Sequence, residues 1–341
     1  MREKRIVYVG AGNWGGDTGK IQVFELDVGA GALALTQEIT AGGVAAFMVR
    51  SRNGRVLYVA DESKGLLSSY AVNPENGHLR LQNQVAAAGH PVYVTLDGAG
   101  SALLTCFFEE ARTEVVAIEP DGSLGASTCL VDSGAESHCT VFDPSHRYLF
   151  VPTRGDNWIA QYIYDSGARR LVPNDPPRII EAPGAGPRHL VFHPSGRFAY
   201  LVNELALTLS VYALDAERGT LKAVQQGLVA TPPDVAGGAA ADIHVHPNGQ
   251  FLYLSNRQQE NSNIAIFSLD AASGRATLVG HELTRGRTPR NFMLDPAGEV
   301  LIVGNLESND VALFRVAAGG ARLDYMRSYA VAPGPFCVRV Y

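Results

Sequence analysis

Short apolar runs alternate with turns along the whole chain, and one stretch shows the pattern clearly. In residues 186–204, GPRHLVFHPSGRFAYLVNE, the apolar runs Leu190 to Phe192 and Phe198 to Val202 flank the turn His193-Pro194-Ser195-Gly196. Proline and glycine in that turn suit a tight reversal, so the stretch predicts an antiparallel hairpin. Its polar groups Arg188-His189 and Asn203-Glu204 lie at the two ends far from the turn.

The same unit recurs along the chain at a nearly constant interval. The other copies are AFMVRSRNGRVLYVAD (46–61), GHPVYVTLDGAGSALLTCF (89–107), ESHCTVFDPSHRYLFVPT (136–153), AAADIHVHPNGQFLYLSN (239–256) and TPRNFMLDPAGEVLIVGN (288–305). Aligning the second apolar run of each unit brings these residues into register: Tyr8, Tyr58, Leu104, Phe150, Tyr200, Tyr253 and Ile302. Their separations of 50, 46, 46, 50, 53 and 49 residues indicate seven repeats.

Each repeat contains four short strands. The hairpin supplies strands A and B, and alternating stretches such as LSVYALD (209–215) and NIAIFSLD (263–270) supply strand C. Strand D follows a glycine-containing turn, as in ERGTLKAVQQ (217–226) and ASGRATLVGHEL (272–283). Regular turns and β-branched or aromatic residues favour strands, and no segment carries a long helical period. The chain is therefore predicted to be all-β, a seven-bladed β-propeller of four-stranded blades.

The two ends of the chain predict how the ring closes. The chain starts with a strand B, RIVYVGAG (5–12), and finishes with a strand A, GPFCVRVY (334–341). We expect the C-terminal strand to join the N-terminal blade, which would remove exposed sheet edges. Residues 1–341 are then a single domain.

Antiparallel pairing places the start of strand A beside the end of strand B, and strand A is innermost in a propeller. All such ends therefore point toward one mouth of the central channel. The starts of strand A are Ala46, Val92, His138, Arg188, Ala241, Arg290 and Phe336. The ends of strand B are Ala11, Asp61, Phe107, Thr153, Asn203, Asn256 and Asn305, each followed in turn by Gly12, Glu62, Phe108, Arg154, Glu204, Arg257 and Leu306. This mouth is polar on one side and apolar on another, which is typical of a small-molecule pocket.

Composition and charge narrow the classes of function. The chain is 46% hydrophobic and 18% charged, with a formal net charge of −6 and no block of basic residues, which argues against nucleic-acid binding. The four cysteines lack the spacing of a disulfide framework or zinc site, so we expect no metal and a reducing compartment. The charged start MREKRI and the lack of a long apolar run predict a cytoplasmic protein without a membrane segment. The closed ring predicts a monomer.

The hairpins of residues 186–204, 239–256 and 288–305 resemble those of the lactonase, or cycloisomerase-2, family. That family includes propeller-type 6-phosphogluconolactonases and fungal carboxymuconate-lactonizing enzymes, and the resemblance is strongest over residues 130–317. It implies a seven-bladed fold, a role in carbohydrate metabolism and no cofactor. By motif, the family's proposed catalytic cluster falls on His138, Arg188, Glu204 and Arg257, and the family also carries a histidine at the position of His244.

These residues could hydrolyse a lactone, with 6-phosphogluconolactone as the leading substrate. Glu204 or His138 would take a proton from the attacking water, while Arg188 polarises the lactone carbonyl. Arg257 and Arg290 would bind the anionic end of the substrate, because guanidinium groups stay protonated and bind oxyanions well. Further predicted substrate contacts are His189, Asn203, His244 and Asn256.

Other interpretations of the same residues remain open. Arg188 and Glu204 could be a structural ion pair, Arg290 could form a rim ion pair, the asparagines could fasten turns, and His244 could be a core residue. The chain could also be a cycloisomerase that acts on a carboxylated substrate, or a non-catalytic binding platform, because fold alone does not determine function.

Overall fold

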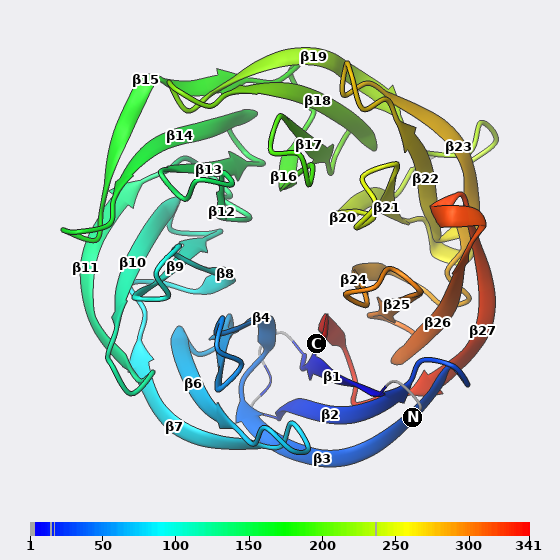
Figure 1. Ribbon diagram of the computed structural model, residues 1–341, viewed down its shortest axis with the longest axis horizontal. Helices are drawn as coiled ribbons and strands as arrows, with labels where there is room; N and C mark the ends of the chain where they lie inside the picture. Colours follow the sequence, from blue (N-terminus) through cyan, green and yellow to red (C-terminus); the bar gives the residue numbers. More distant parts are fainter. Residues whose placement is uncertain (1–3, 14–15, 17, 236) are drawn as a thin grey trace.

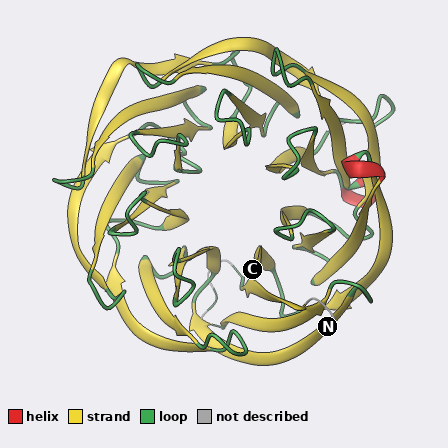
Figure 2. Cartoon of the chain, viewed as in Figure 1, coloured by secondary structure: helices red, strands yellow, loops and turns green. Residues whose placement is uncertain are grey.

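The computed structural model describes residues 4–13, 16, 18–235 and 237–341. Over these residues the strands form seven four-stranded antiparallel sheets, arranged as blades around a central axis (Figures 1 and 2). This confirms the predicted propeller of four-stranded blades. No helix in these residues is long and apolar enough to cross a membrane.

Each blade runs from an innermost strand at the channel to an outermost strand at the rim. The innermost strands, from blade 1 to blade 7, are β28 (Pro335–Val340), β4 (Ala45–Arg50), β8 (Pro91–Leu96), β12 (Val141–Phe142), β16 (Pro187–Phe192), β20 (Ala239–Val245) and β24 (Pro289–Leu294). The second strands are β1 (Lys4–Ala11), β5 (Val56–Asp61), β9 (Ala102–Phe107), β13 (Tyr148–Thr153), β17 (Phe198–Asn203), β21 (Phe251–Arg257) and β25 (Val300–Asn305).

The outer half of each blade completes the ring. The third strands are β2 (Gly19–Asp27), β6 (Leu66–Val72), β10 (Arg112–Ile118), β14 (Trp158–Asp165), β18 (Thr208–Asp215), β22 (Asn263–Leu269) and β26 (Asp310–Ala317). The outermost strands are β3 (Ala32–Gly42), β7 (Leu79–Ala86), β11 (Leu124–Asp132), β15 (Arg170–Ile180), β19 (Thr220–Val229), β23 (Ala276–Leu283) and β27 (Arg322–Ala330). The short 3-10 helices η1 (Gln259–Asn261) and η2 (Ala318–Gly320) lie in turns.

The C-terminal strand closes the ring, as predicted. β28 pairs antiparallel with β1, with Val340 opposite Val7 and Val338 opposite Val9. The N- and C-terminal strands therefore lie side by side in blade 1 (Figure 1).

The aligned tyrosines of the repeat connect neighbouring blades. Each is buried and donates its hydroxyl to a glycine carbonyl in the turn between the third and outermost strands of the next blade. The pairs are Tyr8 to Gly77 (2.9 Å), Tyr58 to Gly122 (3.0 Å), Tyr200 to Gly274 (3.1 Å) and Tyr253 to Gly320 (2.7 Å). The repeat in the sequence thus reflects a repeated contact between blades as well as a repeated strand.

A β-bulge marks the start of most innermost strands. In blade 5, Pro187 pairs with Asn203 and His189 with Val202, so Arg188 is the extra, unpaired residue. Ala46, Val92 and Arg290 occupy the same bulged position in their blades. Such a bulge redirects a side chain out of the regular pleat, which explains why this position supplies residues to the channel mouth.

Blade 4 departs from this pattern at His138. Its innermost strand β12 has only two residues, and the preceding segment is held by an isolated bridge between Ser137 and Thr153. Pro152 on β13 has no N–H to donate to this ladder, although its carbonyl accepts from the His138 N–H at 3.1 Å. His138 therefore lies in irregular backbone where its equivalents lie in strands.

Candidate active site

Three charged residues occupy equivalent positions at the ends of the second strands of blades 4, 5 and 6. They are Arg154, Glu204 and Arg257, and Arg188 joins them from the bulge of β16. Arg154 Nη1 lies 2.6 Å from Glu204 Oε1, whereas Arg188 Nε at 2.9 Å and Arg257 Nη2 at 3.2 Å approach Oε2. One carboxylate therefore holds three guanidinium groups, and we call these four residues the arginine cluster.

Glu204 remains ionised in this cluster. Its side chain is only 6% exposed, and burial alone would raise its pKa. The positive charges of Arg188, Arg257 and Arg154 outweigh burial and lower the pKa of Glu204 to about 2. A carboxylate so strongly stabilised is a weak base, and both of its oxygens already accept contacts from arginines.

Arg188 is the most deeply buried member of the cluster, at 1% exposed. Its Nη1 donates to the Ala241 carbonyl of blade 6 and, at 3.3 Å, to Nε2 of its neighbour His189. Burial lowers the pKa of Arg188, Glu204 opposes that effect, and Arg290 and Arg257 add to it. Arg188 and Glu204 therefore form an ion pair between strands A and B of this hairpin. Further arginines surround this pair with positive charge.

The two cluster arginines closer to solvent have further anchors. Arg154 Nε contacts Glu136 Oε2 at 2.6 Å, and its guanidinium lies over the Phe108 ring at 4.7 Å from the centroid. Arg257 donates through Nη2 to the Ala240 carbonyl at 2.9 Å. These contacts orient both guanidiniums at the mouth, where Arg257 retains 17% side-chain exposure.

Arg290 reaches the same mouth from the bulge of β24, with its guanidinium 4.9 Å from the centroid of the Phe336 ring. Phe336 also lines a cavity of about 460 Å³ on the side of blades 7 and 1. Gly12, Leu306 and Arg287 share this lining. Gly12, Leu306 and Phe336, the uncharged mouth positions of blades 7 and 1, thus border an open space. Arg290 lies next to this space, over the Phe336 ring.

His138 lies on the opposite side of the cluster, 5% exposed. Its ring packs edge-on against Phe108 and His189, with centroids 5.6 and 5.3 Å away. Burial and then the charge of Arg188 lower the pKa of His138 well below its usual value, so the ring is neutral. Its Nδ1 is buried and has no hydrogen-bond partner among the described residues.

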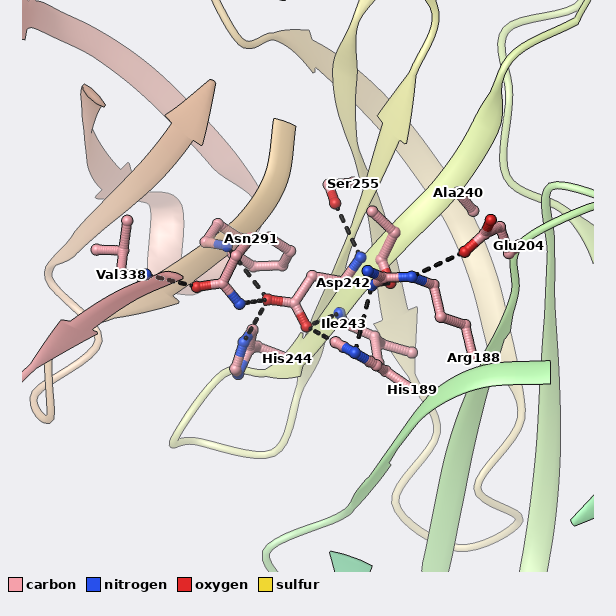
Figure 3. A network of polar contacts seen from close by, with 12 residues as sticks. Arg188, His189, Glu204, Ala240, Asp242, Ile243, His244, Ser255, Asn291 and Val338 are labelled. Carbon is pink, nitrogen blue, oxygen red and sulfur yellow. Dashed lines mark hydrogen bonds and ion pairs between the residues drawn. The ribbon is translucent and has the colours of Figure 1, made fainter. Parts of the chain in front are cut away.

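A second network centres on Asp242 and lies beside the arginine cluster (Figure 3). Asp242 Oδ1 lies 2.8 Å from His189 Nδ1, and Oδ2 lies 3.2 Å from His244 Nε2. Asn291 Nδ2 also donates to Oδ2, and the Ile243 and Phe292 N–H groups complete the shell at 3.0 and 3.2 Å. Burial would raise the pKa of Asp242, but its histidine partners hold it well below the usual range.

The structure separates the predicted contact residues into two groups. His138, Arg188, His189, Glu204, Arg257 and Arg290 meet at the mouth, and His244 joins through Asp242 with 23% side-chain exposure. Asn203 and Asn256 are at most 1% exposed, and their amide groups donate to the neighbouring third strand or to a backbone carbonyl. That arrangement matches the turn-fastening interpretation, because the pleat directs these side chains into the blade. Both side chains are therefore buried within their blades, away from a substrate at the mouth.

Several residues of the site were not singled out in the sequence. The repeat places Arg154 at the mouth without indicating its role, and it does not point to Glu136, Asp242 or Asn291. Asp242 and Asn291 lie one position after the strand A starts, in register with His189. Comparing that next position across the repeats would have revealed them.

Comparison with known proteins agrees with this architecture. A family model described as lactonase, 7-bladed β-propeller, matches residues 6–340. A 6-phosphogluconolactonase from Pectobacterium carotovorum is 34% identical over 99% of this chain and 98% of its own length, and one from Formosa agariphila is 29% identical over 94% and 95%. The solved periplasmic gluconolactonase of Pseudomonas aeruginosa has a TM-score of 0.91 and 27% identity over 99% of both chains. The chain therefore belongs to the lactonase family of seven-bladed β-propellers.

Proposed function

We propose that this protein hydrolyses a sugar lactone at the channel mouth, with 6-phosphogluconolactone as substrate and 6-phosphogluconate as product. The full-length similarity to proteins named 6-phosphogluconolactonase supports the reaction. The observation that carries the assignment to this mouth is the convergence of three arginines on Glu204, with Arg290 nearby.

The arginine cluster suits a substrate that is anionic and becomes more so during the reaction. Each guanidinium has five N–H donors, and Glu204, Glu136 and backbone carbonyls engage only part of this set. Donors that remain can hold a phosphate or the oxyanion that develops on the lactone carbonyl. In a protein of net charge −6, several arginines at one mouth would concentrate such a ligand there.

In this mechanism Glu204 orients the arginines and does not accept the proton. The low pKa of Glu204 makes it a poor base, and its oxygens are occupied. The proton acceptor is then a neutral histidine of the same mouth, either His138 or His189, since the pKa of each is lowered by burial and by Arg188. Neutral imidazole can accept a proton from water as the oxygen attacks the carbonyl carbon.

The test is the initial rate on freshly prepared 6-phosphogluconolactone, corrected for spontaneous hydrolysis, beside unphosphorylated gluconolactone at equal concentration. We expect turnover of both, with the larger kcat/KM for the phosphorylated lactone because its second anionic group meets the arginines. Lactonization of a carboxymuconate without lactone hydrolysis would instead identify a cycloisomerase. No turnover of any of these would contradict an enzymatic role and favour a binding platform.

A further inference from the structure

The ring of His189 is fixed at both of its nitrogens. Nδ1 lies 2.8 Å from Asp242 Oδ1, and Nε2 faces Arg188 Nη1 at 3.3 Å (Figure 3). A carboxylate can only accept, so Nδ1 carries the proton and Nε2 presents its lone pair toward the arginine cluster. Arg188 Nη1 also donates to the Ala241 carbonyl, and that contact is the shorter of the two.

Asp242 is suited to orient a base and unsuited to be one. It accepts hydrogen bonds from two histidines, Asn291 and two backbone N–H groups, which come from strands of three blades. Asn291 is itself held, since its Oδ1 accepts from the Val338 N–H at 2.7 Å. The carboxylate therefore has little freedom to move, and its lone pairs are in use.

The two bases predicted from the sequence, Glu204 and His138, lack this support. Glu204 has both oxygens in ion pairs. His138 has a buried Nδ1 with no partner in the described part of the chain, so no carboxylate orients its ring from that side. A base whose orientation is set by a third group is the arrangement expected of a catalytic proton acceptor.

We propose that His189 Nε2 removes the proton from the attacking water and that Asp242 is the positioning residue that fixes His189 for this step. The inference rests on the proposed lactone hydrolysis and identifies the base within it. Arg188 Nη1 first exchanges its contact with Nε2 for one with the substrate carbonyl, which frees the single lone pair of Nε2. The proton of the water then moves to Nε2 as the water oxygen bonds to the carbonyl carbon, and the carbonyl oxygen takes the negative charge beside Arg188. When the intermediate collapses, the carbonyl re-forms, the ring C–O bond breaks, and the leaving oxygen takes the proton back from His189.

The charges around His189 make the mechanism testable by pH. The titratable and charged groups that face it are Asp242 on β20, Arg188 on β16, Arg290 on β24 and His138 before β12, with the Tyr93 ring of β8 edge-on at 5.4 Å. Burial and then Arg188 lower the pKa of His189 to about 4, whereas Asp242 raises it. An anionic substrate would offset the arginine charges, so the pKa of His189 in the complex is expected to be higher.

The experiment compares the pH profiles of kcat for wild type, His189→Gln and Asp242→Asn. His189→Gln should lower kcat by about 10²-fold or more with a smaller change in KM. Asp242→Asn should lower kcat and also move the acid limb of its profile to lower pH. The negative charge of Asp242 raises the pKa of His189, so removing that charge lowers the pKa. The control is Asp97→Asn, a buried aspartate at the far end of its hairpin that accepts the Ser101 and Ala102 N–H groups.

These outcomes distinguish a wrong assignment of the base from a wrong assignment of the reaction. Full activity of His189→Gln, or an unmoved acid limb in Asp242→Asn, would overturn the inference and leave lactone hydrolysis standing. A wild type without lactone turnover would overturn both. If His189→Gln does not fold, nitrogen-15 NMR of histidine-labelled wild type decides: the proton of His189 should reside on Nδ1, and a proton on Nε2 would contradict the assignment.

Discussion

At the scale of single residues, Glu204 is the carboxylate on which three guanidinium groups converge. A buried ion pair gains little over an apolar replacement, but removal of one partner leaves charges without compensation. Here the remaining partners would be three arginines, of which Arg188 is almost fully buried. Glu204 therefore contributes to stability as well as to the geometry of the cluster.

This contribution should depend on pH in a defined direction. The pKa of Glu204 falls from 4.5 to about 2 on folding, so the stabilisation is fully present above pH 4.5 and is lost as pH falls toward 2. Its size is about 3 kcal/mol. Glu204→Gln should be less stable than wild type at pH 7 by roughly that amount, and the difference should shrink between about pH 5 and 2. Chemical denaturation across this range measures it, and a pH-independent difference would contradict the account.

At the scale of elements, the contact between a tyrosine and a glycine turn joins blades 1, 2, 5 and 6 each to the next blade. Tyr200 donates to the Gly274 carbonyl, and Gly274 adopts a φ of +73°. A Cβ at this position would overlap the ring of Phe198. The turn thus requires glycine both for its backbone conformation and for the close approach of the neighbouring blade.

Gly274→Ala should therefore destabilise the protein more than the same change at Gly227. Gly227 has a similar φ of +67°, but a Cβ there would meet nothing within 4 Å. Backbone strain of about 1 kcal/mol is common to both variants, and overlap with Phe198 should add about 1–3 kcal/mol at Gly274. Thermal unfolding compares the two, and equal losses would show that the blade contact contributes nothing.

The elements also show how far the site could be predicted from sequence. Arg188 and Glu204 were expected to meet because antiparallel pairing determines which residues are neighbours within one hairpin. Asp242 was missed because its partners, His189 and Asn291, lie in the blades on either side, and contacts between blades depend on packing that no hairpin pattern encodes. The sequence pattern places Asn203 and Asn256 at the mouth but does not determine their side-chain directions, which in the structure point into the blades.

At the scale of the whole molecule, the repeat is enough to predict the ring, because seven repeats at six similar intervals leave few other architectures. Closure depends on β28, which supplies Val338 and Val340 to the same buried cluster as Val7 and Val9. Arg339 extends this closure, since its Nε donates to the Met48 carbonyl of blade 2 at 2.8 Å. One short strand therefore joins blade 1 to its neighbour and removes the sheet edge of β1.

Deletion of residues 334–341 should accordingly disrupt the entire ring. It would expose the inner edge of β1 and the valines packed beneath it, which favours aggregation. We expect loss of cooperative thermal unfolding and a shift to large species in size-exclusion chromatography. A truncated chain that remained dispersed and unfolded with the wild-type midpoint would contradict this role for β28.

The central claim is that lactone hydrolysis occurs at the arginine cluster, and Arg257 tests it most directly because its side chain is partly exposed at the mouth. The measurement is kcat/KM for 6-phosphogluconolactone in Arg257→Met, with Arg197→Met, in the turn at the opposite end of the blade 5 hairpin, as the matched control. The account predicts a loss of about 10²-fold or more for Arg257→Met and wild-type values for the control. Equal activity of the two folded variants would place the chemistry elsewhere in the protein.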